Sequence, residues 1–545
     1  MHIRKSVMIC SDLTKMLFLC NKRWLNAFKG TNMGQKICGQ LKQEKVEIFD
    51  LTALRLIERQ AECEHLDLMN VAADAIVDWV VSRYVNTSCI WVAAGVGNNG
   101  GDALFAAHRL HQLGFDVTGI VVTAPISPAT RMAFELCQTL GMNLVERLSD
   151  LSELQKTPDL IIDGLLGIGL NREPSPSLAA LIEELNAINA PILALDVPSG
   201  LNAETGCASG ALIQASDTLT FLGHKSGLWM ADGADAAGRV HLVDLGWRSK
   251  SHLVDRVKTA DFFGELNLNH HIARSLLTRP RNSHKGRFGS LAIVGGNLGM
   301  LGAALLAGRA ALAAGVGKVW LNVLDERLAV DSTAPELMIR QVLSDVSVAT
   351  AVVIGPGLGQ DDAALEAFRS MLNLTLNANR AMVIDADALN IMAKNDEFKS
   401  KLKQCQAQVV LTPHPTEAAR LLNCSTVEIQ ANRVLAAQQL SKAYSSVVVL
   451  KGAGTVIACP NGSFRVNTTG GSALAVAGQG DVLSGVIGAF LAVGVSPFDA
   501  AGLAVYVHGL AGDRYEQDAG GSIGLSANAT VPLISRVLNE WLASS

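Results

Sequence analysis

The sequence predicts an α/β protein built from two three-layer α/β/α domains. From about residue 46 onward, short apolar runs alternate with segments of helical periodicity, the pattern of mostly parallel sheets covered by helices on both faces. A polar stretch at 245–287 interrupts this alternation before it resumes. The chain of 545 residues is also longer than one ordinary core accommodates. We therefore expect two domains, at 46–255 and 265–545.

The composition agrees with this fold class and narrows the function. Charged residues make up 17% and aromatic residues 5%, with 50 Gly, which suits buried parallel strands under closely packed helices. The net charge of −5 gives no reason to expect nucleic acid or an anionic membrane as partner, and no run approaches the ~20 apolar residues of a membrane span. The ten cysteines form no CxxC pair, so we expect reduced cysteines in a cytoplasmic protein.

Residues 1–45 do not continue the pattern. They are moderately basic, with one short apolar patch at 16–20 that is shorter than a signal-peptide core. We expect a poorly structured extension or a misassigned start, with Met33 as an alternative start. An organelle-targeting role is the other alternative.

Six strands are expected in the first domain and eight in the second. The helices between the first six include Ala103–Gln112, Thr130–Leu140 and Ser177–Asn186. Helices Gly302–Ala314 and Asp481–Val493 belong to the second series, whose last strands form a meander around a Pro-Asn-Gly turn at 460–462. The expected strands are Cys89–Ala94, Asp116–Val122, Leu160–Asp163, Pro191–Asp196, Thr218–Leu222, Arg239–Val243, Ser290–Val294, Lys318–Val323, Ala351–Ile354, Ala381–Asp385, Gln408–Thr412, Ser446–Lys451, Thr455–Cys459 and Ser463–Val466.

A glycine-rich loop follows the first of these strands. Gly95-Val-Gly-Asn-Asn-Gly-Gly-Asp102 satisfies the GxGxxG pattern of a Rossmann-like sheet. A nicotinamide dehydrogenase would need an acidic residue at the end of the next strand, but that strand ends Ile120-Val-Val-Thr123. The loop therefore indicates an anion site at a helix start, or a plain tight turn, and disfavours a dehydrogenase.

Further polar residues follow later strands of the same sheet. Asp163 ends one strand, and Asp196 and Ser199 follow another. Because the carboxyl ends of parallel strands share one edge, we expect them to converge with Asp102 in one crevice. An aspartate after a strand can also be only a cap or a turn former. A cluster of this kind can bind a cation through oxygen ligands and leave one carboxylate free for proton transfer.

The motifs GVGNNGGD, LIIDGLLGIGL and LALDVPSGLNAETG, in this order, resemble the NAD(P)H-hydrate epimerase family over about residues 46–250. One departure is Leu68-Met-Asn-Val-Ala-Ala73, where the family reads something like LMERAG. The resemblance implies interconversion of the R and S hydrates of NADH and NADPH, with Asp196 contacting the substrate and moving the proton. It also implies potassium ligands at Asn99, Asp163 and Ser199, and a substrate site at Asn98, Asn99, Gly100, Gly101, Asp102, Gly167, Ile168, Gly169, Leu170, Asn171, Arg172, Glu173 and Asp196.

The second half carries a different set of glycine loops. No GxxxxGK[ST] occurs, but Gly478-Gln-Gly-Asp481 opens an expected helix, where amides can stabilise a transferring phosphoryl group and Asp481 can orient or deprotonate an attacking hydroxyl. This arrangement is typical of a ribokinase-like fold. Each feature alone has an ordinary alternative: His414 can cap a turn, Lys451-Gly-Ala-Gly can be a plain turn, and Asp385 and Asp387 can be helix caps.

The ordered set resembles the ADP-dependent NAD(P)H-hydrate dehydratase family over about 265–540, with one departure where Ala477 replaces a glycine. In that family ADP phosphorylates the hydrate hydroxyl, and loss of phosphate restores the nicotinamide ring, leaving AMP; Mg²⁺ and ADP are thus implied. Asp481 would be catalytic. The substrate contacts implied are Ala303, Gly357, His414 and Asp481, and the ADP contacts are Lys451, Gly452, Ala453, Gly454, Thr455 and Gly480.

Two other functions stay open at this stage. A kinase for a vitamin or sugar would share the Gly-Gln-Gly-Asp481 loop, but does not explain the first domain with Asn99, Asp163, Asp196 and Ser199. A non-enzymatic scaffold would need none of those acidic residues. The favoured hypothesis is a bifunctional repair enzyme that acts on small molecules. Whether it forms a homo-oligomer stays open.

Overall fold

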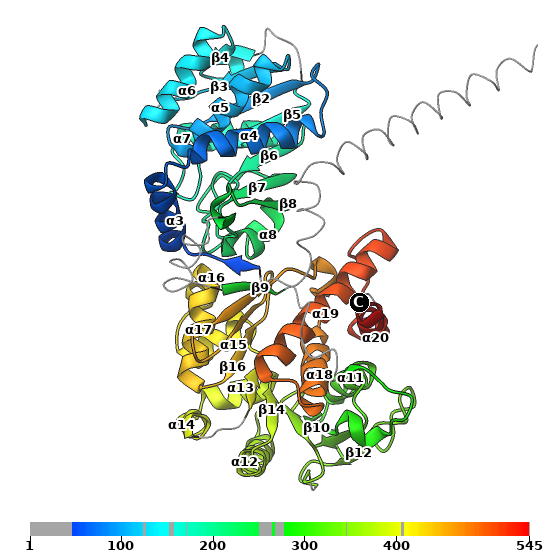
Figure 1. Ribbon diagram of the computed structural model, residues 1–545. Helices are drawn as coiled ribbons and strands as arrows, with labels where there is room; N and C mark the ends of the chain where they lie inside the picture. Colours follow the sequence, from blue (N-terminus) through cyan, green and yellow to red (C-terminus); the bar gives the residue numbers. More distant parts are fainter. Residues whose placement is uncertain are drawn as a thin grey trace, which may run out of the picture. The chain divides into compact units, whose positions relative to one another are not determined.

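The computed structural model describes residues 46–123, 127–151, 157–170, 172–249, 264–267, 277–344, 346–404 and 408–543. These residues build two helix-covered sheets (Figure 1), which confirms the α/β fold class. The expected extension at 1–45 and most of the expected boundary at 250–265 lie outside the described residues.

The first sheet has seven parallel strands in the order β4-β3-β2-β5-β6-β7-β8. Sequence order reverses between β2 and β5, and in Rossmann-like sheets this is where ligands bind, in the crevice outside the carboxyl ends of the strands. The strands are β2 (Cys89–Ala94), β3 (Asp116–Ile120), β4 (Asn143–Val145), β5 (Leu160–Gly164), β6 (Ile192–Leu195), β7 (Asp217–Phe221) and β8 (Arg239–Val243). The helices are α3 (Leu51–Cys63), α4 (Leu68–Val81), α5 (Asn98–Gln112), α6 (Pro128–Thr139), α7 (Pro176–Asn186) and α8 (Gly233–Ala236).

The second sheet has eleven strands in the order β1-β9-β18-β17-β16-β15-β14-β13-β10-β11-β12. It is parallel from β12 to β16, and β16, β17 and β18 form the expected antiparallel meander. Its reversal point lies between β10 and β13. The strands are β1 (Glu47–Ile48), β9 (Gly264–Asn267), β10 (Leu291–Gly295), β11 (Val319–Val323), β12 (Met338–Gln341), β13 (Ala351–Ile354), β14 (Ala381–Ile384), β15 (Val409–Leu411), β16 (Val447–Leu450), β17 (Val456–Ala458) and β18 (Phe464–Asn467).

Ten α-helices are described with this sheet. The two central to its core are α11 (Leu301–Ala313) and α18 (Gln479–Ala492). The others are α12 (Asp362–Asn377), α13 (Ala386–Ala393), α14 (Asp396–Gln404), α15 (Pro415–Leu422), α16 (Thr426–Ala431), α17 (Arg433–Tyr444), α19 (Pro497–Ala519) and α20 (Ala527–Ala543).

Four short strands were not expected from the sequence: β1, β4, β9 and β12. β9 lies within the polar stretch at 245–287, and it forms by pairing with β1 on one side and β18 on the other. β1 in turn comes from the segment that the sequence assigns to the first domain. β1 and β9 pair with strands that are far away in the sequence, and no local apolar run predicts them.

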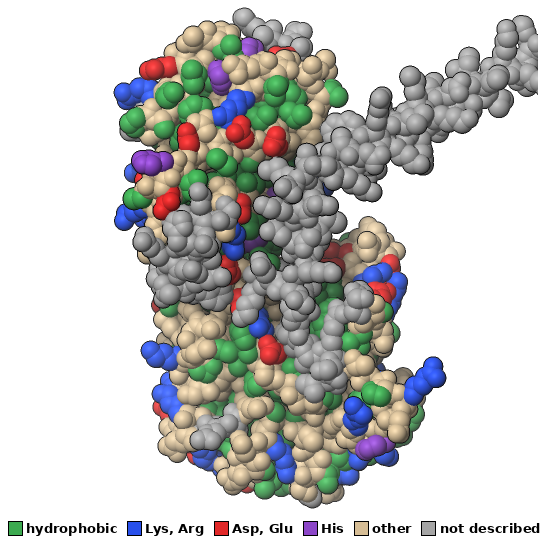
Figure 2. Space-filling model, in the orientation of Figure 1, with side chains coloured by type: hydrophobic (Ala, Val, Ile, Leu, Met, Phe, Trp, Pro, Cys, Tyr) green, Lys and Arg blue, Asp and Glu red, His purple; other side chains and the backbone are tan. Residues whose placement is uncertain are grey.

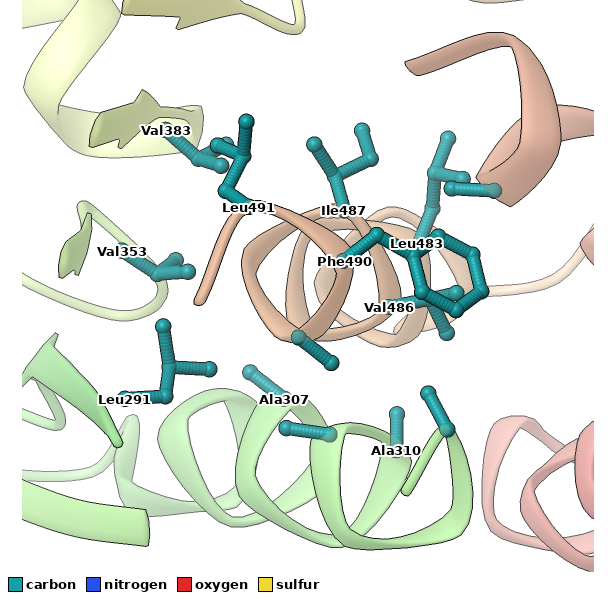
Figure 3. Close-up of a cluster of buried hydrophobic side chains, with 14 of the residues drawn as sticks. Leu291, Ala307, Ala310, Val353, Val383, Leu483, Val486, Ile487, Phe490 and Leu491 are labelled. Atoms are coloured by element: carbon teal, nitrogen blue, oxygen red, sulfur yellow. The ribbon is translucent and has the colours of Figure 1, made fainter. Parts of the chain in front are cut away.

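Helix α18 lies at the centre of the second core. Figure 3 shows Leu291, Val353 and Val383 of the sheet facing α18, with Ala307 and Ala310 of the neighbouring helix α11 packed alongside it. The two helices approach closely because Gly485 has no side chain: a Cβ there would lie 2.1 Å from the carbonyl oxygen of Ala307. This packing fixes the start of α18, where the Gly-Gln-Gly-Asp loop lies.

Charged side chains are scattered over the described part of the face drawn in Figure 2, where Lys, Arg, Asp and Glu lie among uncharged groups. Among the residues that the structure describes, none of the helices has both the length and the apolar composition that crossing a bilayer requires.

Candidate active sites

The glycine loop after β2 is shaped by close backbone packing. A Cβ on Gly100 would lie 1.9 Å from the carbonyl oxygen of Gly95, and one on Gly95 would lie 1.8 Å from that of Leu165. Only glycine fits at either position. Helix α5 then begins at Asn98 without a side-chain cap, so its first amides have no acceptor within the helix. The loop therefore offers backbone donors at the reversal point of the sheet.

Asn99, Asp163 and Ser199 occupy the same crevice. The Ser199 hydroxyl donates to Oδ1 of Asp163 at 2.6 Å, and the Ser199 amide donates to Oδ2 at 2.9 Å. The Asn99 side-chain amide donates to the carbonyl oxygens of Leu166 and Leu195 at 3.0 and 3.2 Å. All three predicted cation ligands are buried. The structure thus brings together residues separated by up to 100 positions.

Two observations make this cluster suited to a bound cation. Oδ1 of Asn99 is buried and has no hydrogen-bond partner among the described residues, although buried carbonyl oxygens normally have one. Burial raises the pKa of Asp163 to about 6, against the opposing hydrogen bonds from Ser199. An unpaired amide oxygen and a desolvated carboxyl would both gain from a bound cation.

Asp196 follows β6 in the left-handed region, at φ +65°, a costly conformation for a residue with a side chain. Its side chain forms an ion pair with Lys225, which sequence reasoning did not identify. Nearby carboxyls respond to it. Burial, then Asp196, then Glu58 raise the pKa of Asp102 well above its usual value, and burial followed by Asp196 raises the pKa of Glu58. Asp102 and Asp196 are therefore in the same electrostatic environment, as the sequence predicts.

The loop after β5 supplies the remaining predicted substrate contacts of this half. Gly167 lies against Asn99, because a Cβ on Gly167 would be 3.3 Å from that of Asn99. Further along, Gly169 is exposed, and so are Arg172 and Glu173. Asn171 lies outside the described residues. This loop thus runs from the buried cation cluster out to solvent.

In the second half, two predicted substrate residues are neighbours. Gly357 has φ +59°, and a Cβ there would lie 3.2 Å from that of Ala303 and 2.3 Å from the carbonyl oxygen of Met300. Gly355 is packed equally tightly, with a would-be Cβ 1.8 Å from the carbonyl oxygen of Asp385. The loop after β13 therefore lies against both the start of α11 and the end of β14.

Asp385 is the centre of a buried polar network. Its Oδ1 accepts from Nζ of Lys451 at 2.9 Å, and its Oδ2 accepts from the Ser484 hydroxyl at 2.6 Å. Although Asp385 precedes α13, its side chain makes no capping bond, so the alternative of a simple helix cap does not hold for it. Burial opposes the charged form of Lys451, but the carboxyls of Asp385 and Glu417 outweigh burial and raise its pKa.

Asp481, in the first turn of α18, lies in the field of this network. Burial and then Asp385 raise the pKa of Asp481 to about 7, while Lys451 opposes the rise. Glu417 behaves in a similar way: burial raises its pKa to about 7 against the effect of Lys451. Asp481 and Glu417, the two carboxyl groups beside Lys451, can therefore each gain or lose a proton near neutral pH.

His414 does form the helix cap that its position allows. Its Nδ1 accepts from the amides of Thr416 and Glu417 at 3.1 and 3.4 Å, and Oε2 of Glu417 accepts from the His414 amide at 2.8 Å. The side chain is still 47% exposed. Capping fixes the orientation of the ring. Burial and then the charge of Lys451 lower the pKa of His414.

The predicted ADP loop joins these elements. The Lys451 amide donates to the carbonyl oxygen of Pro413 at 3.0 Å, and Nζ of Lys451 lies 3.2 Å from where a Cβ of Gly480 would be. The Thr455 hydroxyl donates to the carbonyl oxygen of Gly452 at 2.9 Å, and Ala453 between them is exposed. Gly452 has φ +138° and Gly454 has φ +63°, so both need glycine.

Gln479, inside the Gly-Gln-Gly-Asp loop, was also missed by sequence reasoning. It is buried, its Nε2 donates to Thr530 Oγ1 at 2.8 Å, and its Oε1 lies 2.9 Å from Nε2 of His508. These bonds tie the loop to α19 and α20. The only signal in the sequence is the position between two glycines, which does not reveal whether the side chain faces inward.

Comparison with known proteins agrees with the two halves. A family model described as YjeF-related protein N-terminus matches residues 65–227, and a model described as NAD(P)H-hydrate dehydratase matches residues 291–531. A bifunctional NAD(P)H-hydrate repair enzyme of Escherichia coli is 37% identical over 481 residues, covering 87% of this chain and 89% of that protein. The chain belongs to the bifunctional NAD(P)H-hydrate repair enzyme family.

A bifunctional NAD(P)H-hydrate repair enzyme of Coxiella burnetii is 33% identical over 507 residues, covering 90% of this chain and 99% of that protein. Among solved structures, an ADP/ATP-dependent NAD(P)H-hydrate dehydratase from Bacillus subtilis is 31% identical and covers 51% of this chain and 98% of that chain, with a TM-score of 0.45. The family assignment covers both halves, as the two resemblances in the sequence imply, with a ribokinase-like second half.

Proposed function

We propose that this chain repairs hydrated nicotinamide nucleotides in two steps. The first site interconverts the R and S hydrates of NADH and NADPH, and the second dehydrates the S form with ADP, giving AMP and phosphate. The observation that supports this most directly is the presence of two separate clusters of polar side chains, each near the reversal point of its own sheet. Each holds an aspartate in an unusual environment, Asp196 in one and Asp481 in the other.

In the first crevice, we assign the acid–base role to Asp196. The hydrate carbon carries a hydroxyl group and is bonded to the ring nitrogen. Removal of the hydroxyl proton lets the carbon–nitrogen bond break, and reclosure from the other face followed by return of the proton inverts the centre. No redox partner is needed, so one carboxylate suffices. Asn98–Asp102 and Gly167–Glu173 would hold the nucleotide.

A potassium ion would sit between Asn99, Asp163 and Ser199. The unpaired Oδ1 of Asn99 and the buried carboxyl of Asp163 are oxygen donors of the kind a hard cation prefers. When bound, the ion would supply a positive charge beside the carboxyl group of Asp163. Its removal should lower the thermal stability of this half, which is measurable by exchanging K⁺ for choline at constant ionic strength.

In the second crevice, we assign Asp481 the role of orienting and deprotonating the hydrate hydroxyl. The start of α18 would stabilise charge on the transferring phosphoryl group. Ala303, Gly357 and His414 would contact the hydrate, whereas Lys451–Thr455 and Gly480 would contact ADP. Phosphorylation turns the hydroxyl into a good leaving group, so a phosphoryl-transfer site can serve a dehydration.

Mg²⁺ would enter this site on the phosphates of ADP. Among the described residues, no group of three His, Cys, Asp or Glu side chains could hold a metal ion. Mg²⁺ is commonly held by few carboxylates together with substrate phosphates.

We further propose that 46–255 carries the epimerase and 265–545 the dehydratase, with 1–45 as an extension outside both. The six described cysteines are free, which supports a reducing compartment and hence the cytoplasm.

A mixture of R and S NADH hydrates tests the whole proposal. With ADP, the absorbance of NADH should recover completely, because epimerisation feeds the S-specific step. Recovery that stops at the S fraction would refute the first activity, and recovery without any adenine nucleotide would refute the second. ATP with a pyridoxine-like alcohol, given in parallel, tests the kinase alternative through phosphorylated product.

A further inference from the structure

Behind Asp196 lies a lysine with almost no exposed surface. Lys225 follows β7 and is 1% exposed. Its Nζ donates to Oδ1 of Asp196, to the Thr220 hydroxyl at 2.9 Å and to the carbonyl oxygen of Phe221 at 2.7 Å. A buried ammonium is tolerated only when it is paired and hydrogen-bonded. Here Asp196 supplies the opposite charge, and Asp196, Thr220 and Phe221 supply the hydrogen-bond acceptors.

The valence of the ammonium group limits what Lys225 can do. It has three N–H donors, and all three are taken by protein acceptors. No hydrogen is left for a substrate, so Lys225 can act on the reaction only through Asp196.

The two oxygens of Asp196 are held differently. Oδ1 accepts from Lys225 and also from the Phe221 amide at 3.2 Å. None of the described residues donates a hydrogen bond to Oδ2, and the Asp196 side chain is 13% exposed. With the backbone fixed at φ +65°, one oxygen is anchored and the other is presented to the crevice.

The surrounding charges make this anchor necessary. The pKa values of Asp102 and Glu58 are both raised, first by burial and then by Asp196. Glu62 adds to the rise at Glu58, while Lys225 and Arg55 oppose it. Lys225 is thus the buried positive charge that offsets Asp196 in a pocket of carboxyl groups.

We propose that Lys225 is a positioning residue for epimerisation. It fixes Oδ1 of Asp196 and offsets the negative charge of the carboxylate, so that Oδ2 alone takes the hydroxyl proton and returns it after reclosure. Each proton taken is given back to the same substrate, so the step is balanced without a co-reactant. This inference rests on the epimerase function proposed above.

The test uses the full chain with Lys225→Ala. Because the second site consumes only the S form, ADP-dependent dehydration of pure S hydrate reports folding of the same molecules. We expect kcat for R-to-S conversion to fall about 100-fold with less than about a threefold change in KM, and dehydration to stay within about twofold. Ethylammonium, which fits the space left by the lysine, should restore part of kcat, whereas tetramethylammonium, which has no N–H donor, should not.

The outcomes separate the two proposals. A wild-type chain that does not interconvert the hydrates refutes the epimerase function itself. A wild-type chain that does, together with a Lys225→Ala chain at near-normal kcat or a loss carried wholly by KM, overturns the role of Lys225. If Lys225→Ala loses both activities through misfolding, Lys225→Gln decides: it keeps a donor for Oδ1 but no charge, and undiminished epimerisation in it would equally overturn the proposal.

Discussion

Substitution of Asp385 by asparagine should change the pH dependence of dehydration in a predictable direction. Asp481 must be ionised to accept a proton, so the rate rises as pH passes through its pKa of about 7. After burial, Asp385 is the main cause of that raised pKa, and Lys451 opposes it. Asp385→Asn removes the raising charge and leaves Lys451 less neutralised. Both effects lower the pKa of Asp481, so the acid limb moves to lower pH.

The size of the effect follows from simple titration. With a pKa of about 7, the ionised fraction of Asp481 rises from about 9% at pH 6 to about 91% at pH 8, so kcat should rise about tenfold. Weakening the repulsion from Asp385 by only about 0.7 kcal/mol reduces that rise to about fourfold. The ratio of rates at the two pH values therefore reports the interaction even if the absolute rate falls.

The assay is ADP-dependent recovery of NADH from pure S hydrate between pH 5.5 and 8.5, with saturating ADP. Glu417→Gln is the matched control, because the pKa of Glu417 is also raised to about 7. The limb should persist in Glu417→Gln and shift in Asp385→Asn. A limb that disappears in Glu417→Gln, or one that moves to higher pH in Asp385→Asn, would refute the assignment to Asp481.

Three further substitutions test other parts of the structure. Asp196→Asn should reduce interconversion of the hydrates about 100-fold or more and leave ADP-dependent dehydration of S hydrate intact; equal loss of both activities would contradict separate sites. Gly452→Ala should raise KM for ADP about tenfold with unchanged epimerisation, because φ is +138° and the new Cβ would lie 2.9 Å from the Arg433 guanidinium; an unchanged KM would argue against this loop as the ADP site. Phe490→Ala, at a fully buried position, should cost about 3–5 kcal/mol of unfolding free energy in urea, and a cost below about 1 kcal/mol would contradict the packing in Figure 3.

The fold was predictable where a strand is buried on both faces. For β2 and β13 the bounds agree with the expected Cys89–Ala94 and Ala351–Ile354, because a strand covered by helices must be apolar throughout. The bounds of the edge strand β8 also agree with the expected Arg239–Val243, although its residues are exposed or only partly buried. β1, β4 and β12 are two to four residues long, and β9 is polar. β1 and β9 depend on partners distant in sequence. β4 and β12 pair with the strands that precede them in the chain, but strands this short contain too few residues to show a pattern.

The sites were predictable only in part, for a related reason. A glycine loop is visible in the sequence, because the backbone there requires glycine. An aspartate at a strand end is visible as well, because it ends an apolar run. Glu58 lies within helix α3, and nothing in its local sequence distinguishes it from a solvated charge. Lys225 follows β7 at the same sheet edge as Asp196, which is the one signal that could have drawn attention to it. For Asp385 the sequence left two roles open, and only the bonds to Lys451 and Ser484 decide between them.

Both halves place a buried lysine beside an aspartate at the carboxyl edge of a parallel sheet, yet the pairs serve different chemistry. Lys225 bonds directly to Asp196, the residue assigned to move the proton, and it has no donor left for a ligand. Lys451 bonds to Asp385 instead, at the start of a glycine loop and within reach of Gly480, so its charge can also face a phosphate. In the first site the lysine sets the geometry of one carboxylate. In the second, Asp385 holds the lysine, and the carboxylate to which we assign proton acceptance, Asp481, is a separate residue whose pKa burial and then Asp385 raise to about 7 against the effect of Lys451. Epimerisation moves only a proton, whereas phosphoryl transfer must also neutralise an anion, and the two arrangements follow that difference.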